Sequence, residues 1–391
     1  MTLRVKMTLL ELIYTCIHKR IYMCIVEAME TLKLRHPIYS KLKAWGLKPL
    51  VVDFYVQRVW STFSLERIFA RVASMRSAAQ GIVTIHLRPN FNFKRFEAGQ
   101  HVLLTTNVNG QRVTRTYSPT QLADRSLEIT VKEIPNGKVS ASLVKNLKQG
   151  ALIELSEAFG EMTWSCLPLS THYVFCAGGV GITPLRSLIH AWDLRDELHQ
   201  DRKIELHYWA KSNDEHCFQQ ELGAIAQRHS GLRLHYYESQ SEFHKVTLTT
   251  VLTTVLHTDL NPVVVVACGP QGFVQSAESI AAFHGLRFFG EHAQTTAPAA
   301  PDSHAAETFF EITYSGKKIQ ASSQKSILES LEAQGFEPAH GCRMGLCKSC
   351  TCMKKSGATS SAKDQSVSDE PNEEIQICVA RPRSAINLER Y

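Results

Sequence analysis

The sequence has no uninterrupted apolar run long enough to cross a bilayer. Its most apolar stretch, residues 1–29, is broken by Glu11 and by His18, Lys19 and Arg20, whereas a spanning helix needs about 20 apolar residues. This stretch also lacks the small-residue cleavage site of a signal peptide. We therefore expect a cytoplasmic protein, whose thiols stay reduced and whose cysteines more often bind metal or catalyse.

Long runs of Lys and Arg are missing as well. The formal net charge is only +6 over 391 residues, and no basic stripe of the kind that binds a phosphate backbone is present. Nucleic acid is therefore not an expected partner. Internal repeats are also absent from the sequence.

What is present is the composition of a globular protein with several domains. Apolar residues make up 44% of the chain and charged residues 20%, and 391 residues exceed the size of one ordinary core. Residues 293–306 are rich in Ala, Pro and Thr and have no apolar periodicity. This composition predicts an interdomain linker.

Four segments with different patterns surround the linker. Residues 1–62 form a mostly helix-like extension, and residues 63–168 alternate short strand-like runs with turns, as in an antiparallel β-barrel. Residues 169–292 alternate apolar strands with helical stretches, which predicts an α/β domain with a parallel sheet. Residues 307–391 begin with a strand-like hairpin pattern and make up a C-terminal domain.

Four cysteines of this C-terminal domain have a characteristic spacing. Cys342, Cys347 and Cys350 follow C-x4-C-x2-C, and 27 residues separate Cys350 from Cys378, which falls in a strand-like run. This is the spacing of plant-type [2Fe-2S] ligation. A zinc site is the alternative, because Cys347 and Cys350 form one C-x2-C knuckle close to His340, but zinc sites usually pair two such knuckles.

With the hairpin before them and "ICVARP" after them, these cysteines make residues 307–391 resemble a plant-type ferredoxin domain. The resemblance implies a β-grasp fold that carries one electron at a time. Cys352 matches no ligand position, so we predict that it packs in the core.

In the barrel segment, "RTYS" places Arg115 and Tyr117 on one face of a strand. A cation for a phosphate and a flat ring can thus reach one ligand. Farther on, "NGKVS" has Gly137 at a turn and Ser140 where a helix is expected to start, and exposed N–H groups at a helix start bind phosphate. Taken alone, Ser140 is equally compatible with an ordinary N-cap.

The α/β segment contains a second pair of motifs. "VFCAGGVGITPL" runs from a strand through Gly178, Gly179 and Gly181 into a helix that starts near Thr183 and Pro184. Glycines allow a pyrophosphate to approach the backbone, and the helix dipole favours its charge. The spacing is not G-x-G-x-x-G, so the glycines alone are compatible with a mere tight turn. The second signal is a "CGP" that ends another strand about ninety residues later.

These motifs together resemble the ferredoxin-NADP reductase superfamily, and "FEAGQHVLL" resembles its strand before the flavin site. The resemblance implies that Arg115 and Ser140 hold the pyrophosphate of FAD. It also implies that Tyr117 and Ser118 face the isoalloxazine and that Cys268 lies beside the nicotinamide, which makes these three the predicted catalytic residues. The residues implied to bind FAD or the nicotinamide dinucleotide are Arg115, Thr116, Tyr117, Ser118, Gly137, Lys138, Val139, Ser140, Gly178, Gly179, Gly181, Thr183, Pro184, Lys211, Ser212, Cys268, Gly269 and Pro270.

The choice between NADPH and NADH depends on the stretch "HYWAKSNDE". Lys211 and Ser212 come before Asp214 and Glu215, and Lys245 lies farther on. A cation accommodates the additional phosphate of NADP, whereas a carboxylate binds the ribose of NAD. Within the family, a basic residue and a serine at this place are associated with NADP, so NADPH is the expected donor and NADH the alternative.

One feature departs from the family. Its members commonly end the reductase half with an acidic residue and a nearby aromatic residue that lies over the flavin. Here Glu291 is followed by His292 and Ala293. The aromatic residue is therefore missing, unless Phe288 or Phe289 takes its role.

The order of the segments implies that electrons pass from NAD(P)H through FAD and a [2Fe-2S] cluster to a protein acceptor. The stretches 53–72 and 84–104, "DFYVQRVWSTFSLERIFARV" and "TIHLRPNFNFKRFEAGQHVLL", resemble bacterial reductases that serve membrane fatty-acid desaturases. A di-iron desaturase is the first predicted acceptor, and a Rieske-type oxygenase or demethylase is the second. The alternative of another class is a scaffold that binds metal and flavin without turnover.

The N-terminal stretch has two interpretations. Met29 is a candidate for the true start of translation. Alternatively, the amphipathic residues before it rest on the inner face of the membrane, near the acceptor.

Overall fold

The computed structural model of the chain falls into two units, residues 1–66 and 67–391. Much of the predicted helical extension, all of the predicted linker and Lys245 lie outside the described residues. The described residues are 53–54, 56–58, 60–108, 111–134, 137–194, 202–239, 248–256, 263–292, 307–341, 343, 345, 347–362 and 366–390.

The described part of the first unit is held together by a buried carboxylate. Asp53 is 3% exposed and accepts hydrogen bonds from the Ser64 hydroxyl at 2.6 Å and from the Leu65 N–H at 2.9 Å. The Gln57 amide donates to the Phe63 carbonyl at 2.8 Å. Among the described residues, no helix is both long and apolar enough to span a bilayer.

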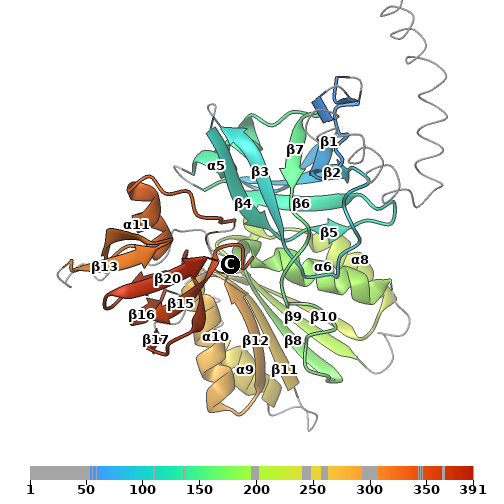
Figure 1. Ribbon diagram of the computed structural model, residues 1–391. Helices are drawn as coiled ribbons and strands as arrows, with labels where there is room; N and C mark the ends of the chain where they lie inside the picture. Colours follow the sequence, from blue (N-terminus) through green and yellow to red (C-terminus); the bar gives the residue numbers. More distant parts are fainter. Residues whose placement is uncertain are drawn as a thin grey trace, which may run out of the picture. The chain divides into compact units, whose positions relative to one another are not determined.

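The first domain of the second unit is a curled antiparallel sheet (Figure 1) with the strand order β4-β3-β7-β1-β2-β6-β5. Its alternating strands direct apolar side chains such as Ile85, Leu104 and Ile129 into one core, which helix α5 closes with Val139 and Leu143. The elements are β1 (Ile68–Ala79), β2 (Ile82–Pro89), β3 (Val102–Val108), β4 (Gln111–Tyr117), β5 (Thr120–Gln121), β6 (Leu127–Lys132), α5 (Lys138–Lys145) and β7 (Leu152–Leu155).

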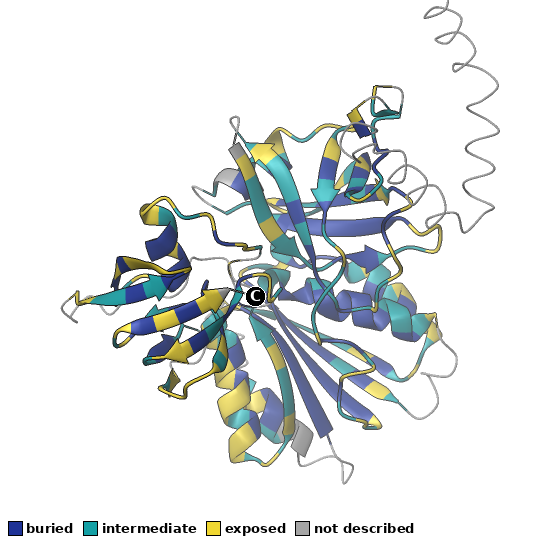
Figure 2. Ribbon diagram, viewed as in Figure 1, coloured by how far each residue is buried: buried dark blue, intermediate teal, exposed yellow. Residues whose placement is uncertain are grey.

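The second domain is a five-stranded parallel sheet with the order β10-β9-β8-β11-β12. The central strands β8 and β11 are buried along their whole length (Figure 2) because helices cover both faces. Helices α6 and α8 bury Leu188 and Leu222 on one face, and α9 and α10 bury Leu252 and Ala277 on the other. The elements are β8 (His172–Gly178), η2 (Gly179–Gly181), α6 (Ile182–Asp193), β9 (Lys203–Ala210), η3 (Asn213–Glu215), α8 (Gln219–Arg228), β10 (Leu232–Glu238), α9 (Leu248–Leu256), β11 (Val263–Gly269), α10 (Gln271–Phe283) and β12 (Arg287–His292).

The third domain has the mixed sheet of a β-grasp, with the order β14-β13-β20-β15-β18 and a small second sheet β17-β16-β19. The first strand, β13, pairs parallel with the last, β20, and helix α11 begins with a capping box between Ser326 and Glu329. The elements are β13 (Phe309–Tyr314), β14 (Lys317–Ser322), α11 (Ile327–Ala333), β15 (Thr351–Ser356), β16 (Thr359–Ser361), β17 (Val367–Ser368), β18 (Glu373–Gln376), β19 (Ala380–Pro382) and β20 (Ile386–Arg390).

The predicted sequence of barrel, parallel sheet and β-grasp is thus confirmed. One local prediction was wrong, because Cys378 lies in the turn between β18 and β19 rather than inside a strand. The alternative that Ser140 is an ordinary N-cap is excluded, because Gly137 takes that position in α5. Cys352 is buried in the core of the third domain, where packing accounts for it.

Candidate functional site

The motif "RTYS" lies where strand β4 ends at Tyr117. Arg115 is exposed, and Tyr117 packs against the barrel core, where burial raises the pKa of its hydroxyl against the opposing effect of the Arg115 charge. Between them, Oγ1 of Thr116 is buried and has no hydrogen-bond partner among the described residues. In chain order, this strand end therefore offers the cation of Arg115, the hydroxyl of Thr116 and the ring of Tyr117.

Helix α5 begins at the second barrel motif. Its N-cap is Gly137, which has no side chain to accept from the first N–H groups of the helix. The Ser140 hydroxyl accepts from the Ile134 N–H at 3.1 Å and thereby connects the first turn of the helix with the residues after β6. A side chain at Gly137 would collide with that hydroxyl, since a Cβ there would lie 2.6 Å from it. The arrangement suits a phosphate at the helix start.

The two motifs of the α/β domain meet at the carboxyl edge of the parallel sheet. Strand β8 ends at Gly178 and β11 at Gly269, and a Cβ on Gly269 would lie 3.0 Å from the Gly178 Cα. A Cβ on Gly181 would lie 2.1 Å from the Cys268 carbonyl oxygen. Only glycine permits this approach, which brings the backbone at the starts of α6 and α10 close together.

Thr183, Pro184 and Pro270 lie at these two helix starts. The Thr183 hydroxyl donates to the Val180 carbonyl at 3.0 Å and closes the turn before α6. Pro184 is the third residue of α6, and Pro270 is the N-cap of α10. Proline is tolerated there because the first N–H groups of a helix have no intrahelical acceptor.

A hydrogen-bonded chain, which sequence reasoning missed, connects the barrel with the α/β domain. His101 Nδ1 lies 2.9 Å from the Ser118 hydroxyl, and His101 Nε2 pairs with Glu291 at the end of β12. The His101 and Glu291 side chains are only 8% and 12% exposed. Glu291 is the register partner of Cys268 on the neighbouring strand β11. This series of hydrogen bonds therefore extends from one predicted catalytic residue, Ser118, towards another, Cys268.

Cys268 is a buried thiol in this arrangement. Burial raises its pKa well above the ordinary value, and the nearby Glu291 carboxylate raises it further. The sulfur is therefore a neutral group at physiological pH, suited to contact with an apolar ring rather than to nucleophilic attack. Phe288 and Phe289 pack against hydrophobic clusters of the parallel sheet, so core packing accounts for both rings.

The loop after β9 contains the residues that were predicted to choose the dinucleotide. Lys211 is exposed and Ser212 precedes the turn η3. Glu215 in that turn forms an ion pair at 2.7 Å with Lys132 of the barrel strand β6. The Asp214 carbonyl accepts from the Gln80 N–H at 3.0 Å. The turn is thus attached to the barrel, and one of its two carboxylates is already paired with a cation.

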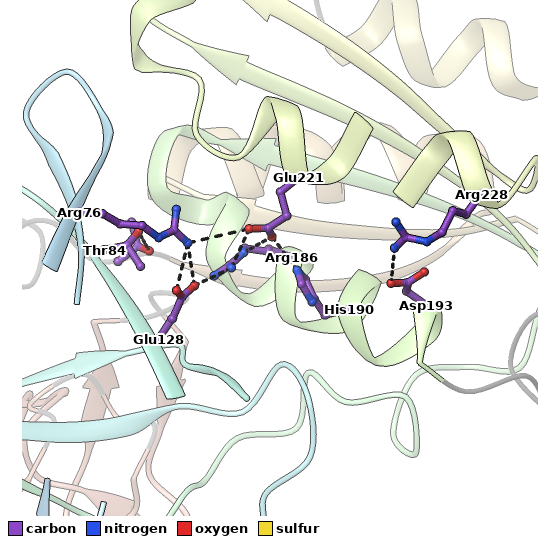
Figure 3. A network of polar contacts seen from close by, with 9 residues as sticks. Arg76, Thr84, Glu128, Arg186, His190, Asp193, Glu221 and Arg228 are labelled. Atoms are coloured by element: carbon purple, nitrogen blue, oxygen red, sulfur yellow. Dashed lines mark hydrogen bonds and ion pairs between the residues drawn. The ribbon is translucent and has the colours of Figure 1, made fainter. Parts of the chain in front are cut away.

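A buried arginine anchors a second polar network between the two domains (Figure 3). Arg186 of α6 is 2% exposed and bonds to Glu128 of β6 at 2.7 Å and to Glu221 of α8 at 2.5 Å. Arg76 of β1 also bonds to Glu128, at 2.9 Å. Burial alone would raise the pKa of Glu221, but hydrogen bonds from His190 and Arg186 lower it to about 2. The carboxylate therefore stays charged and the network stays intact at neutral pH.

Three of the four predicted cluster ligands are described, whereas Cys342 lies outside the described residues. Cys347 Sγ lies 2.8 Å from the position that a Cβ on Gly341 would take, so the backbone at Gly341 approaches this sulfur closely. Cys350 and Cys378 are each 3% exposed, and a hydrogen bond from Cys378 lowers the pKa of the Cys350 thiol to about 7. The structure thus brings thiols 28 positions apart in sequence within contact, as a shared metal centre requires.

Comparison with known families divides the chain in the same order. An oxidoreductase FAD-binding domain matches residues 76–164, an oxidoreductase NAD-binding domain matches residues 175–279, and a 2Fe-2S iron-sulfur cluster binding domain matches residues 310–383.

Individual proteins resemble the chain over most of their length. An NADPH oxidoreductase of Mycobacterium tuberculosis is 26% identical over 88% of this chain and 91% of its own. The glycine betaine monooxygenase reductase subunit of Pseudomonas aeruginosa is 24% identical over 75% of this chain and 87% of its own. The structure of phthalate dioxygenase reductase, described as modular for electron transfer from pyridine nucleotides to [2Fe-2S], is 25% identical, covers 83% of this chain and 98% of that one, and has a TM-score of 0.58.

The described residues fit the groups that these domains bind. The exposed Arg115 at the end of β4 and the start of α5 at Gly137 suit FAD. The glycine-lined edge at Gly178 and Gly269 suits a dinucleotide. The contact between Cys350 and Cys378 suits an iron-sulfur cluster.

Proposed function

Because the chain is a ferredoxin-NADP reductase superfamily flavoprotein fused to a C-terminal plant-type [2Fe-2S] ferredoxin domain, we propose that it supplies single electrons to an oxygen-activating iron enzyme on a separate chain. The chain is an NAD(P)H-dependent oxidoreductase that carries FAD and a [2Fe-2S] cluster. Bound flavin supplies the conversion of a hydride, which carries two electrons, into single electrons. The observation that carries the reductase part of the proposal is the hydrogen-bonded series Ser118–His101–Glu291, which connects the two reductase domains beside Cys268.

We assign the barrel residues to FAD and the glycine-lined edge to the dinucleotide. Arg115 and the start of α5 at Gly137 to Ser140 bind the pyrophosphate of FAD, and Tyr117 and Ser118 orient its ring. Gly178, Gly181 and the "CGP" motif hold the dinucleotide, and Cys268 positions the nicotinamide. Cys342, Cys347, Cys350 and Cys378 ligate the cluster.

NADPH is the proposed donor. Lys211 and Ser212 bind its additional phosphate, and the pairing of Glu215 with Lys132 supports this by removing one competing carboxylate. The M. tuberculosis relative is itself named an NADPH oxidoreductase.

His101 holds or moves a proton between the two domains. Its Nδ1 faces the Ser118 hydroxyl and its Nε2 faces the Glu291 carboxylate, so an imidazole can accept a proton on one nitrogen and donate from the other. The His101 and Glu291 side chains are 8% and 12% exposed, which keeps bulk water away from this part of the route.

A membrane acyl desaturase is the first proposed acceptor. The resemblance of residues 53–72 and 84–104 to reductases of such desaturases supports it. The membrane contact predicted for residues 1–28 lies outside the described residues and belongs to this proposal.

Reconstitution tests the acceptor. The holoprotein, NADPH and vesicles containing an acyl desaturase and its acyl lipid should give unsaturated product at a rate that depends on the reductase concentration. Cys347→Ser should abolish transfer by removing a cluster ligand, whereas Cys166→Ser, at an exposed cysteine, should leave it unchanged. Deletion of residues 1–28 should slow the vesicle reaction but not cytochrome c reduction. Product formation that is independent of the protein would reject the desaturase.

The second proposed acceptor is a Rieske-type oxygenase or demethylase. The names of the Pseudomonas relative and of phthalate dioxygenase reductase favour it, since both denote reductases of oxygenases. The same assay can be run with an oxygenase component and its substrate in place of the desaturase. The acceptor that gives NADPH-dependent turnover is the one that this protein serves.

A further inference from the structure

A cluster of ligand-type side chains lies on β9 and β10, away from the nucleotide edge. Glu205, His207 and His235 place one candidate ligand atom each within 4.8 Å of the others. Glu205 and His207 are two residues apart on β9 and so share a face, and His235 is the register partner of His207 on β10. Lys211 is six positions along the chain from Glu205, roughly 20 Å along a strand. The cluster is thus a site of its own.

One buried ring nitrogen in this cluster has no hydrogen-bond partner among the described residues. It is Nε2 of His207, a residue that is 4% exposed. The nearest carboxylate oxygen, Oε2 of Glu205, lies 3.7 Å away, beyond hydrogen-bond distance. A buried nitrogen without a hydrogen-bond partner destabilises the fold. A bound ligand that accepts the nitrogen lone pair would remove this destabilisation.

The other ring nitrogen of His207 is already oriented. Nδ1 lies 3.0 Å from the Tyr237 hydroxyl. A metal-binding imidazole characteristically bonds to a neighbour through its second nitrogen, which fixes the ring and its tautomer. With Nδ1–H donating to Tyr237, Nε2 presents its lone pair towards Glu205.

Two further basic side chains approach Glu205 on its other oxygen. Glu205 Oε1 lies 3.4 Å from His172 Nε2 and 3.5 Å from Arg233 Nη1, and the Arg233 side chain is 69% exposed. Oε2 is the oxygen nearest to His207 Nε2. One carboxylate oxygen is thus directed at the cluster and the other at the surrounding basic groups.

We propose that Glu205, His207 and His235 form a binding site for a divalent transition-metal ion of the zinc class. Two imidazoles and a carboxylate are a ligand set that such ions accept, with water as a fourth ligand. The rings of His207 and His235 are stacked 4.6 Å apart at 6°, so His235 must rotate to bring its lone pair to the ion. It lies on β10, the edge strand of its sheet, where this rotation meets no further strand.

Metal binding to the full-length holoprotein tests the site. With the cluster and flavin in place, calorimetric titration with Zn²⁺ alone should give one site outside the cluster cysteines. His235→Ala and Glu205→Gln should each weaken this binding by at least about 10-fold. His284→Ala, at a histidine of the same domain after α10, is the matched control and should bind like the wild type.

X-ray absorption at the zinc edge identifies the ligands. The proposal predicts a first shell of nitrogen and oxygen at about 2.0–2.1 Å, whereas cysteine sulfur would appear at about 2.3 Å. His235→Ala changes an edge residue and is expected to fold, and an unchanged flavin and cluster spectrum checks this. A sulfur shell, wild-type affinity in both ligand variants, or no binding at micromolar Zn²⁺ would each overturn the site.

Discussion

His101 bonds to one side chain in each reductase domain, Ser118 in the barrel and Glu291 at the end of β12. Replacement of His101 with Phe would leave a buried hydroxyl and a buried carboxylate without this partner. We expect kcat for NADPH-dependent dye reduction to fall on the order of 10²-fold, the usual scale for the loss of a positioned proton-transfer group. KM for NADPH should change little, because the glycine-lined edge is untouched.

The matched control for this change is His86→Phe. His86 also pairs with a serine hydroxyl, Ser126, at 2.7 Å, but it lies within the barrel. Its loss should leave kcat unchanged. Equal losses of kcat in both variants would mean that His101 serves only the stability of the barrel.

Arg186 is the second residue on which the pairing of the two domains depends. Arg186→Met removes the buried cation and leaves Glu128 and Glu221 charged, which is expected to destabilise the reductase by about 3 kcal/mol. Arg228→Met is the control. Arg228 forms an ion pair with Asp193, but its side chain is 55% exposed. Loss of this exposed ion pair should lower the free energy of unfolding by at most about 1 kcal/mol. Urea unfolding of both variants measures the difference, and equal midpoints would contradict the role given to Arg186.

Among the secondary-structure elements, the ends of β8 and β11 depend on glycine for their close approach. In Gly181→Ala the new Cβ would meet the Cys268 carbonyl oxygen at 2.1 Å, so the backbone must move. We expect KM for NADPH to rise by about 10-fold or more, because displacement of about 1 Å at a reacting site costs up to 10²-fold. Retention of bound flavin and of the cluster spectrum would show that the remaining domains are folded.

Gly223→Ala in α8 is the corresponding control. A Cβ at Gly223 meets nothing within 4 Å, and alanine in a helix interior is more favourable than glycine by about 0.5–1 kcal/mol. This variant should be slightly more stable than the wild type and keep its KM. A normal KM in Gly181→Ala would show that the dinucleotide does not depend on this edge.

Patterns within single elements made much of the fold predictable from the sequence. Alternation marked the barrel strands, and uniformly apolar runs marked the buried strands β8 and β11. The cysteine spacing identified the third domain. The turn at Cys378 was not predictable in this way, because the largely apolar run "IQICVA" continues through it without a turn signal.

For the whole molecule, the contacts that sequence reasoning missed join residues far apart in the chain. His101 and Glu291 are separated by 190 positions, and Arg186 and Glu128 by 58. No local motif marks either pair. A histidine in or next to a strand, such as His101, and an arginine in a helix, such as Arg186, are too common to indicate a distant partner. The stacking of His207 on His235 likewise depends on knowing that β9 and β10 pair in this register. Such pairs follow from the packing of complete domains.

The electron relay through the whole molecule is the central claim, and an anaerobic absorbance titration of the holoprotein with NADPH tests it most directly, with NADH in a parallel cuvette. We predict that the flavin bands bleach together with the broad iron-sulfur absorbance, and at a lower concentration of NADPH than of NADH. A colourless protein that holds stoichiometric zinc at its cysteines, or flavin bleaching without any change in the cluster absorbance, would contradict the account.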